Sequence, residues 1–145
     1  MEQAVFEAIK GTIMFLNRLS IDEKEAFLAL AHHVAHSDND FSMEEEVLIA
    51  KYCMEMQMDD IEYDAVRFDL ASVLNTFECD SHQKIALLEL MALIYADGEV
   101  AKQEQQLLND MITHFELNPN LAIVYREWSK NILSLFTQGE ALIHL

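Results

Sequence analysis

Two short acidic stretches of this chain carry the residues best suited to binding a metal ion. The first is SDNDFSMEEE, residues 37–46, and the second is YADGEVAKQE, residues 95–104. In a calcium-binding EF-hand loop, oxygen ligands occupy alternate early positions, a glycine follows at the sixth, and a glutamate closes the loop at the twelfth. Asp97, Gly98 and Glu104 stand at the fifth, sixth and twelfth positions of that pattern. The second stretch therefore fits the later half of a calcium-binding loop.

Neither stretch can be a complete EF-hand loop, because the first two ligand positions lack carboxylates. They hold Leu93 and Tyr95 in the second stretch, and Val34 and His36 in the first. Asn39 also replaces the glycine in the first stretch. The acids must then work in another arrangement, or serve only the helices that follow them.

An internal repeat brings the two stretches into register. A shift of 59 residues lays residues 37–49 over residues 96–108 and matches each acid of the first stretch with an acid of the second. We predict a helix–loop–helix duplication with units at about 20–58 and 79–117. If the units pack about a pseudo-twofold axis, six acids gather at one end and favour a divalent cation, with calcium or magnesium preferred. These candidate ligands are Asp38, Asp40, Glu45, Asp97, Glu99 and Glu104.

The same residues also fit a structural interpretation that needs no metal. Ser42 followed by Glu45 forms a capping box, in which each side chain bonds the backbone N–H of the other residue. In the second stretch Ala101 replaces the serine, although Glu104 is kept. The weaker cap beside persistent acids indicates that the acids do something besides capping.

The remaining pattern predicts an all-α protein, a compact bundle forming one domain over residues 1–145. The chain has one proline and three glycines, and strand-like alternation is hard to find. Ser20 with Glu23, and Asn118 before Pro119, mark two helix starts. Other expected caps are Asp59 or Asp60, and Asp80 or Ser81. We expect about seven helices, near residues 2–17, 21–37, 43–57, 61–77, 82–96, 102–115 and 119–139, followed by a tail at 140–145.

Three histidines in the sequence AHHVAH form a second candidate site. His32 and His36 lie one turn apart, a spacing that can hold zinc or nickel, and His33 is also within reach of His36. Their partners in the repeat are Met91, Ala92 and Tyr95. Because those are residue types expected inside a protein, partly buried histidines are favoured over metal ligands.

Composition narrows the function classes. Nine Lys and Arg against 26 Asp and Glu give a net charge of −17, which repels nucleic acid and anionic membranes and suits cations or a partner with a basic surface. Cys53 and Cys79 have no metal or redox spacing and indicate a cytoplasmic protein with reduced thiols. The most apolar run, residues 85–96, is too short to span a membrane. No nucleophilic triad, phosphate-binding loop or Glu-x-x-His pair is present, so we expect no enzyme.

The two acidic stretches, each after an apolar helix, resemble the signature of the TerB-like family, the helical domains associated with tellurite resistance. That signature has a small residue, Asp-Gly, an apolar residue and a Glu one turn later, and the resemblance covers about residues 20–117. It implies an all-helical cytoplasmic protein in stress or tellurite resistance, without enzyme activity and with metal binding proposed for the motif acids. This carries best to Asp97 and Glu104, and less well to Asp38 and Glu45 because of Asn39. The alternative is an acidic helical interaction module that binds a basic partner without metal.

Overall fold

A computed structural model of the chain describes residues 15–37, 43–95 and 100–145, and these ranges contain helices and no strand. The prediction of an all-α fold is therefore confirmed for them. Within these ranges, no helix combines the length and the apolarity that crossing a membrane requires. The elements are a short 3-10 helix η1 (Leu16–Arg18) and the α-helices α2 (Ile21–His36), α3 (Met43–Met56), α4 (Leu70–Asn75), α5 (Asp80–Tyr95), α6 (Lys102–His114) and α7 (Pro119–Ile143).

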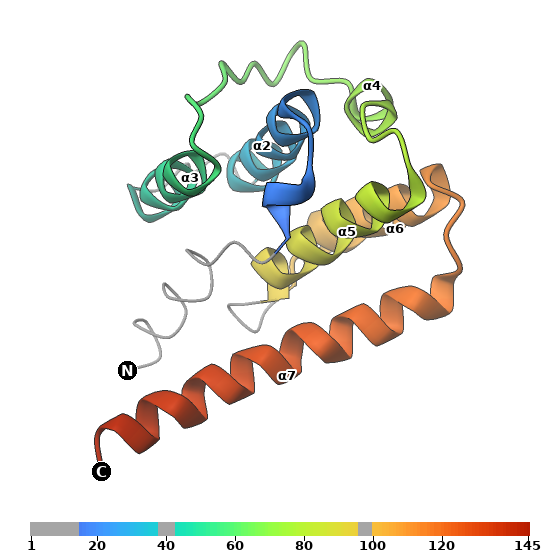
Figure 1. Cartoon of the computed structure of the whole chain (residues 1–145). Helices are drawn as coiled ribbons and strands as arrows, with labels where there is room; N and C mark the ends of the chain where they lie inside the picture. The colour runs from blue at the N-terminus through green and yellow to red at the C-terminus, as the bar shows by residue number, and fades with distance from the viewer. Residues whose placement is uncertain (1–14, 38–42, 96–99) are drawn as a thin grey trace.

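The helices form three layers, with α5 and α6 between the α2–α3 pair and α7 (Figure 1). Helix α5 contacts α2, α6, α7 and η1, and α4 bridges α2 and α6. Half of the residues of α5 are buried, including Leu87, Leu90 and Ile94. A helix that is apolar nearly all round belongs inside a bundle, which explains the central place of α5.

Two buried carboxylates tie these layers together. Glu89 in α5 accepts a hydrogen bond from the backbone N–H of Phe15 at 2.8 Å, just before η1. Glu23 forms the predicted capping box with Ser20 and also accepts from His82 Nδ1 at 2.8 Å. Burial alone would raise the pKa of Glu23, but its hydrogen bonds outweigh burial and hold the pKa below its usual value of 4.5.

Several predicted helix boundaries are confirmed to within two residues. Helices α2, α3, α5 and α6 lie within the ranges expected from the sequence or start two residues earlier. Asn118 caps α7 as predicted, because its side chain accepts from the backbone N–H of Asn120 at 2.9 Å, and Pro119 is the first helical residue. Asp80, by contrast, is the first helical residue of α5 and does not precede it as a cap.

The predicted helix at residues 61–77 is wrong over most of its length. Only Leu70–Asn75 is helical, and residues 57–69 cross over α2 without helical structure (Figure 1). Asp60 does not cap a helix here, because its carboxylate lies beside His32 and accepts from the N–H of Ile61. Side chains that bond across to another helix hold this segment out of the helical conformation.

The two ends of the chain also differ from expectation. Gly139 does not end α7, which continues to Ile143 and includes most of the predicted tail. An interior glycine costs a helix about 1 kcal/mol relative to alanine, which by itself does not stop a long helix. Residues 15–17 are not part of an α-helix, because Phe15 has φ −133° and precedes the 3-10 turn. The rest of the predicted helix at 2–17 lies outside the described residues.

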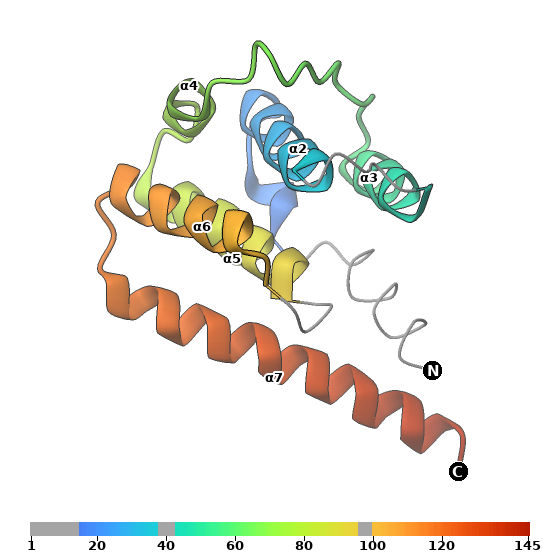
Figure 2. The same ribbon diagram turned by 180° about the vertical axis from the view of Figure 1, so that it is seen from behind.

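Helix α7 is much longer than the helix it packs on. At about 1.5 Å per residue, its 25 residues span about 37 Å, against about 24 Å for the 16 residues of α5. Figures 1 and 2 both show the C-terminal part of α7 reaching beyond the end of α5. Only the N-terminal part of α7 can therefore share a surface with α5 and α6.

Candidate functional site

Glu104 is the one acidic candidate whose side chain the structure describes. It lies in the first turn of α6, and its Oε1 accepts a hydrogen bond from the backbone N–H of Ala101 at 2.8 Å. Alanine has no side-chain oxygen to return this bond, so only half of a capping box is formed. The predicted structural role of Glu104 is confirmed, and the predicted weaker cap has this physical cause.

The other five candidate ligands cannot be placed. Asp38, Asp40, Asp97 and Glu99 lie outside the described residues, as does the side chain of Glu45, so their convergence and the capping box of Ser42 with Glu45 stay predictions. Among the residues that are described, no group of three or more His, Cys, Asp or Glu side chains could hold a metal ion. The zinc or nickel alternative for the three histidines is therefore not supported.

The histidines instead bind the segment that connects α3 and α4. His32 is buried, and its Nε2 lies 2.9 and 3.1 Å from the two carboxylate oxygens of Asp60. His33 Nδ1 lies 3.0 Å from the hydroxyl of Tyr63, and its ring stacks on Phe68 with centroids 4.1 Å apart. This arrangement, together with His36, is called the histidine clasp below.

His36 completes the clasp from the end of α2. Its ring stacks on Tyr63 with centroids 4.8 Å apart, and its Nδ1 lies 2.7 Å from the carbonyl oxygen of His32. His33 and His36 are half-buried, as predicted for interfacial histidines. Burial, and then the charge of His36, lowers the pKa of His33 below its usual value of 6.5. The clasp holds residues 57–69 against α2.

Neither cysteine has the environment of a nucleophile. Both thiols are free, as expected, with Cys53 buried and Cys79 exposed. Burial, followed by the neighbouring carboxylate of Asp60, raises the pKa of Cys53 to about 11. Because the thiolate is the reactive form, Cys53 is held in its unreactive state near neutral pH.

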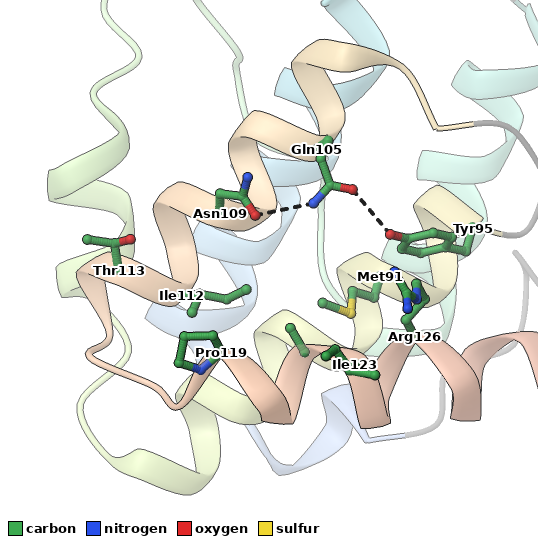
Figure 3. A pocket seen from close by; sticks show the side chains of 10 residues that line it. Met91, Tyr95, Gln105, Asn109, Ile112, Thr113, Pro119, Ile123 and Arg126 are labelled. Carbon is green, nitrogen blue, oxygen red and sulfur yellow. Dashed lines mark hydrogen bonds between the residues drawn. The ribbon is translucent and has the colours of Figure 1, made fainter.

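A groove between α5, α6 and α7 is the candidate binding site (Figure 3). Its volume is about 320 Å³, at the lower end of the range of about 300 to 1,000 Å³ found for ligand sites. The lining residues are Met91 and Tyr95 from α5, Gln105, Asn109, Ile112 and Thr113 from α6, and Pro119, Ala122, Ile123 and Arg126 from α7.

The groove has an apolar floor and a polar wall. The Tyr95 hydroxyl donates to Gln105 Oε1 at 3.4 Å, and Gln105 Nε2 donates to Asn109 Oδ1 at 3.2 Å. Arg126 stands at the rim, where its Nε lies 3.7 Å from a carboxylate oxygen of Glu127, too far for a hydrogen bond. Within the described part of the chain this buried Nε makes no hydrogen bond. The guanidinium therefore keeps a donor for a bound group.

Sequence reasoning missed the groove because three helices contribute to it. The polar residues Gln105, Asn109 and Thr113 recur every fourth position of α6, which is a stripe on one helix face, but the same spacing is common on solvated faces. Comparison with family models, with curated proteins and with solved structures finds no match to this chain. The function must therefore be argued from the geometry alone.

Proposed function

We propose that this protein is a non-catalytic helical interaction module, which binds a partner polypeptide in the groove between α5, α6 and α7. The observation that carries the proposal is an open groove of about 320 Å³ that combines apolar lining with a few polar groups. This composition is the usual one for binding sites. A TerB-like, cytoplasmic role in stress or tellurite resistance remains the setting that the sequence resemblance implies.

The charge of the molecule favours a partner with a basic surface. A net charge of −17 attracts basic segments over a distance and speeds their association. The groove itself supplies the short-range contacts, with Ile112 and Ile123 for an apolar side chain and Arg126 for an acceptor group. A segment with one apolar anchor flanked by Lys or Arg fits both features.

Two neighbouring substitutions on α7 test this proposal. Ile123 lines the groove, whereas Val124, which is also exposed, does not. Peptides selected from a random library on the wild-type protein are titrated by fluorescence anisotropy. We expect Ile123→Glu to weaken binding at least tenfold and Val124→Glu to change it less than twofold. Selection of no peptide, or equal effects of the two substitutions, would contradict binding in the groove.

We also propose a divalent cation as a ligand of the acidic turn before α6. The supporting observation is Glu104, which its hydrogen bond to Ala101 fixes beside residues 97 and 99 in the sequence. Calorimetric titration of chelator-treated protein with calcium, magnesium, zinc and manganese tests it. We expect Asp97→Asn combined with Glu104→Gln to abolish the heat of binding, and Asp110→Asn, an exposed acid later in α6, to preserve it. No heat at millimolar concentrations would reject the cation.

A further inference from the structure

The groove and the histidine clasp occupy equivalent faces of the two repeated helix pairs. The 59-residue shift lays α2 over α5, so that His32 corresponds to Met91 and His36 to Tyr95. Met91 and Tyr95 line the groove, whereas His32 and His36 belong to the clasp. The same face of the framework is therefore covered in the first unit and open in the second.

A contact between the units supports this correspondence. Glu23 and His82 are separated by 59 residues and so hold equivalent positions, and they meet at 2.8 Å. Equivalent residues touch each other only where they lie next to a twofold axis relating the two units. The pairing of positions used above therefore has a basis in the packing as well as in the sequence.

An aromatic ring closes the first unit, and its counterpart is missing in the second. Tyr63 stacks on His36 at 4.8 Å and lies parallel to His32 at 5.6 Å. The shift places Ala122 at the position of Tyr63, and Ala122 lines the groove. Alanine has only a methyl group where the first unit has a phenol ring. The second unit thus presents a surface built to be covered by a ring that its own chain does not provide.

We propose that the groove binds an aromatic side chain of a partner polypeptide, flanked by basic residues, in the place that Tyr63 fills in the first unit. This inference rests on the proposed function, because it names the group that the groove accepts. Met91 offers a thioether, which packs favourably against aromatic rings. Arg126 offers a guanidinium, which is attracted to the electron-rich face of a ring.

The arrangement of the groove suits a ring more than an aliphatic side chain. Figure 3 shows Tyr95, Met91 and Arg126 gathered at one end of the groove, with Ile123 beside them and Gln105 opposite. The unused Nε of Arg126 and the Tyr95–Gln105 hydrogen bond lie within the lining, so a phenol hydroxyl or indole N–H can also find a polar partner. Basic flanking residues complement the net charge of −17.

The test uses a matched set of short peptides and one substitution that imitates the first unit. The peptides carry two lysines on each side of a central Trp, Tyr, Phe, Leu or Ala, and binding is followed by NMR shifts of the Ile112 and Ile123 methyl groups. We expect the aromatic peptides to bind at least fivefold more tightly than the leucine peptide. Ala122→Tyr should weaken their binding at least tenfold, since the protein then covers its own groove.

Two controls separate the possible failures. Val124→Tyr adds the same ring next to the groove and should leave binding within twofold of wild type, and an unchanged backbone NMR spectrum away from α7 verifies folding of each variant. Equal binding of leucine and aromatic peptides, lost in Ala122→Tyr, would overturn the aromatic preference but keep the groove as a binding site. Methyl shifts that none of the peptides induces, or binding that neither Ala122→Tyr nor Ile123→Glu weakens, would overturn both.

Discussion

The helix pairs α2–α3 and α5–α6 share one framework but are completed in different ways. After α3, residues 57–69 fold back without helical structure, and Tyr63 and Phe68 cover α2 through the histidine clasp. After α6, the chain forms the long helix α7, which packs on α5 and leaves a groove beside Ala122. The difference shows how one exchange, a tyrosine for an alanine at equivalent positions, can turn a closed structural surface into an open one.

The largest expected effect concerns the contact between the two units. Glu23→Ala removes half of a capping box and the hydrogen bonds from His82 and from the backbone N–H of Glu78. We expect a loss of about 3 kcal/mol in the free energy of unfolding, because a cap and each hydrogen bond contribute about 1 kcal/mol. Urea denaturation measures it. Glu25→Ala, an exposed position in the same helix, is the control, and similar losses in both variants would argue against a special contact.

The next effect tests whether the clasp closes the first unit. Tyr63→Ala removes two ring stacks and the hydrogen bond to His33, for which we expect a loss of about 2 kcal/mol. The substitution should also create in the first unit an open face like the groove of the second. Thermal and urea unfolding give the stability, with Glu62→Ala as the exposed neighbour for comparison. A loss below that of Glu62→Ala would mean that residues 57–69 are held by other contacts.

A smaller effect of opposite sign is expected in α7. A Cβ added at Gly139 meets no atom within 4 Å, and the residue lies inside the helix. Gly139→Ala should therefore stabilise the protein by up to about 1 kcal/mol, because alanine is the better helix former. A destabilised variant would show that the helix does not run unbroken through this position. This measurement sharpens the contrast between a continuous α7 and the non-helical residues 57–69.

The smallest expected effect is a pH dependence of the clasp. The pKa of His33 in the folded protein lies below its usual value of 6.5, so the unfolded chain binds the proton more readily. The contribution of His33 to stability is then fully present above pH 6.5 and is lost as pH falls toward the folded pKa. Urea denaturation between pH 7.5 and 5.5 should show a smaller decline in His33→Gln than in wild type. Equal declines would assign the pH dependence to other groups.

The sequence predicts the helices best where local signals and packing agree. The Ser20–Glu23 capping box and the Asn118–Pro119 start are local features, and both occur as predicted. The helix at 61–77 fails because the partners of Asp60 and Tyr63 are about thirty residues away on α2, and no local pattern shows such contacts. The groove is likewise invisible locally, because it depends on how α7 lies across α5 and α6. Of the six predicted ligands, only Glu104 could be compared with the structure.

The pair formed by Glu23 and His82 has a consequence for how the two halves of the chain relate. In a symmetric dimer of identical units, this position would meet itself, as two neighbouring carboxylates or as two imidazoles. Two carboxylates in such a buried place repel each other, and one of them would have to take up a proton. The complementary pair requires units that differ at this point. Each half has therefore become the specific mate of the other, and neither can replace its neighbour.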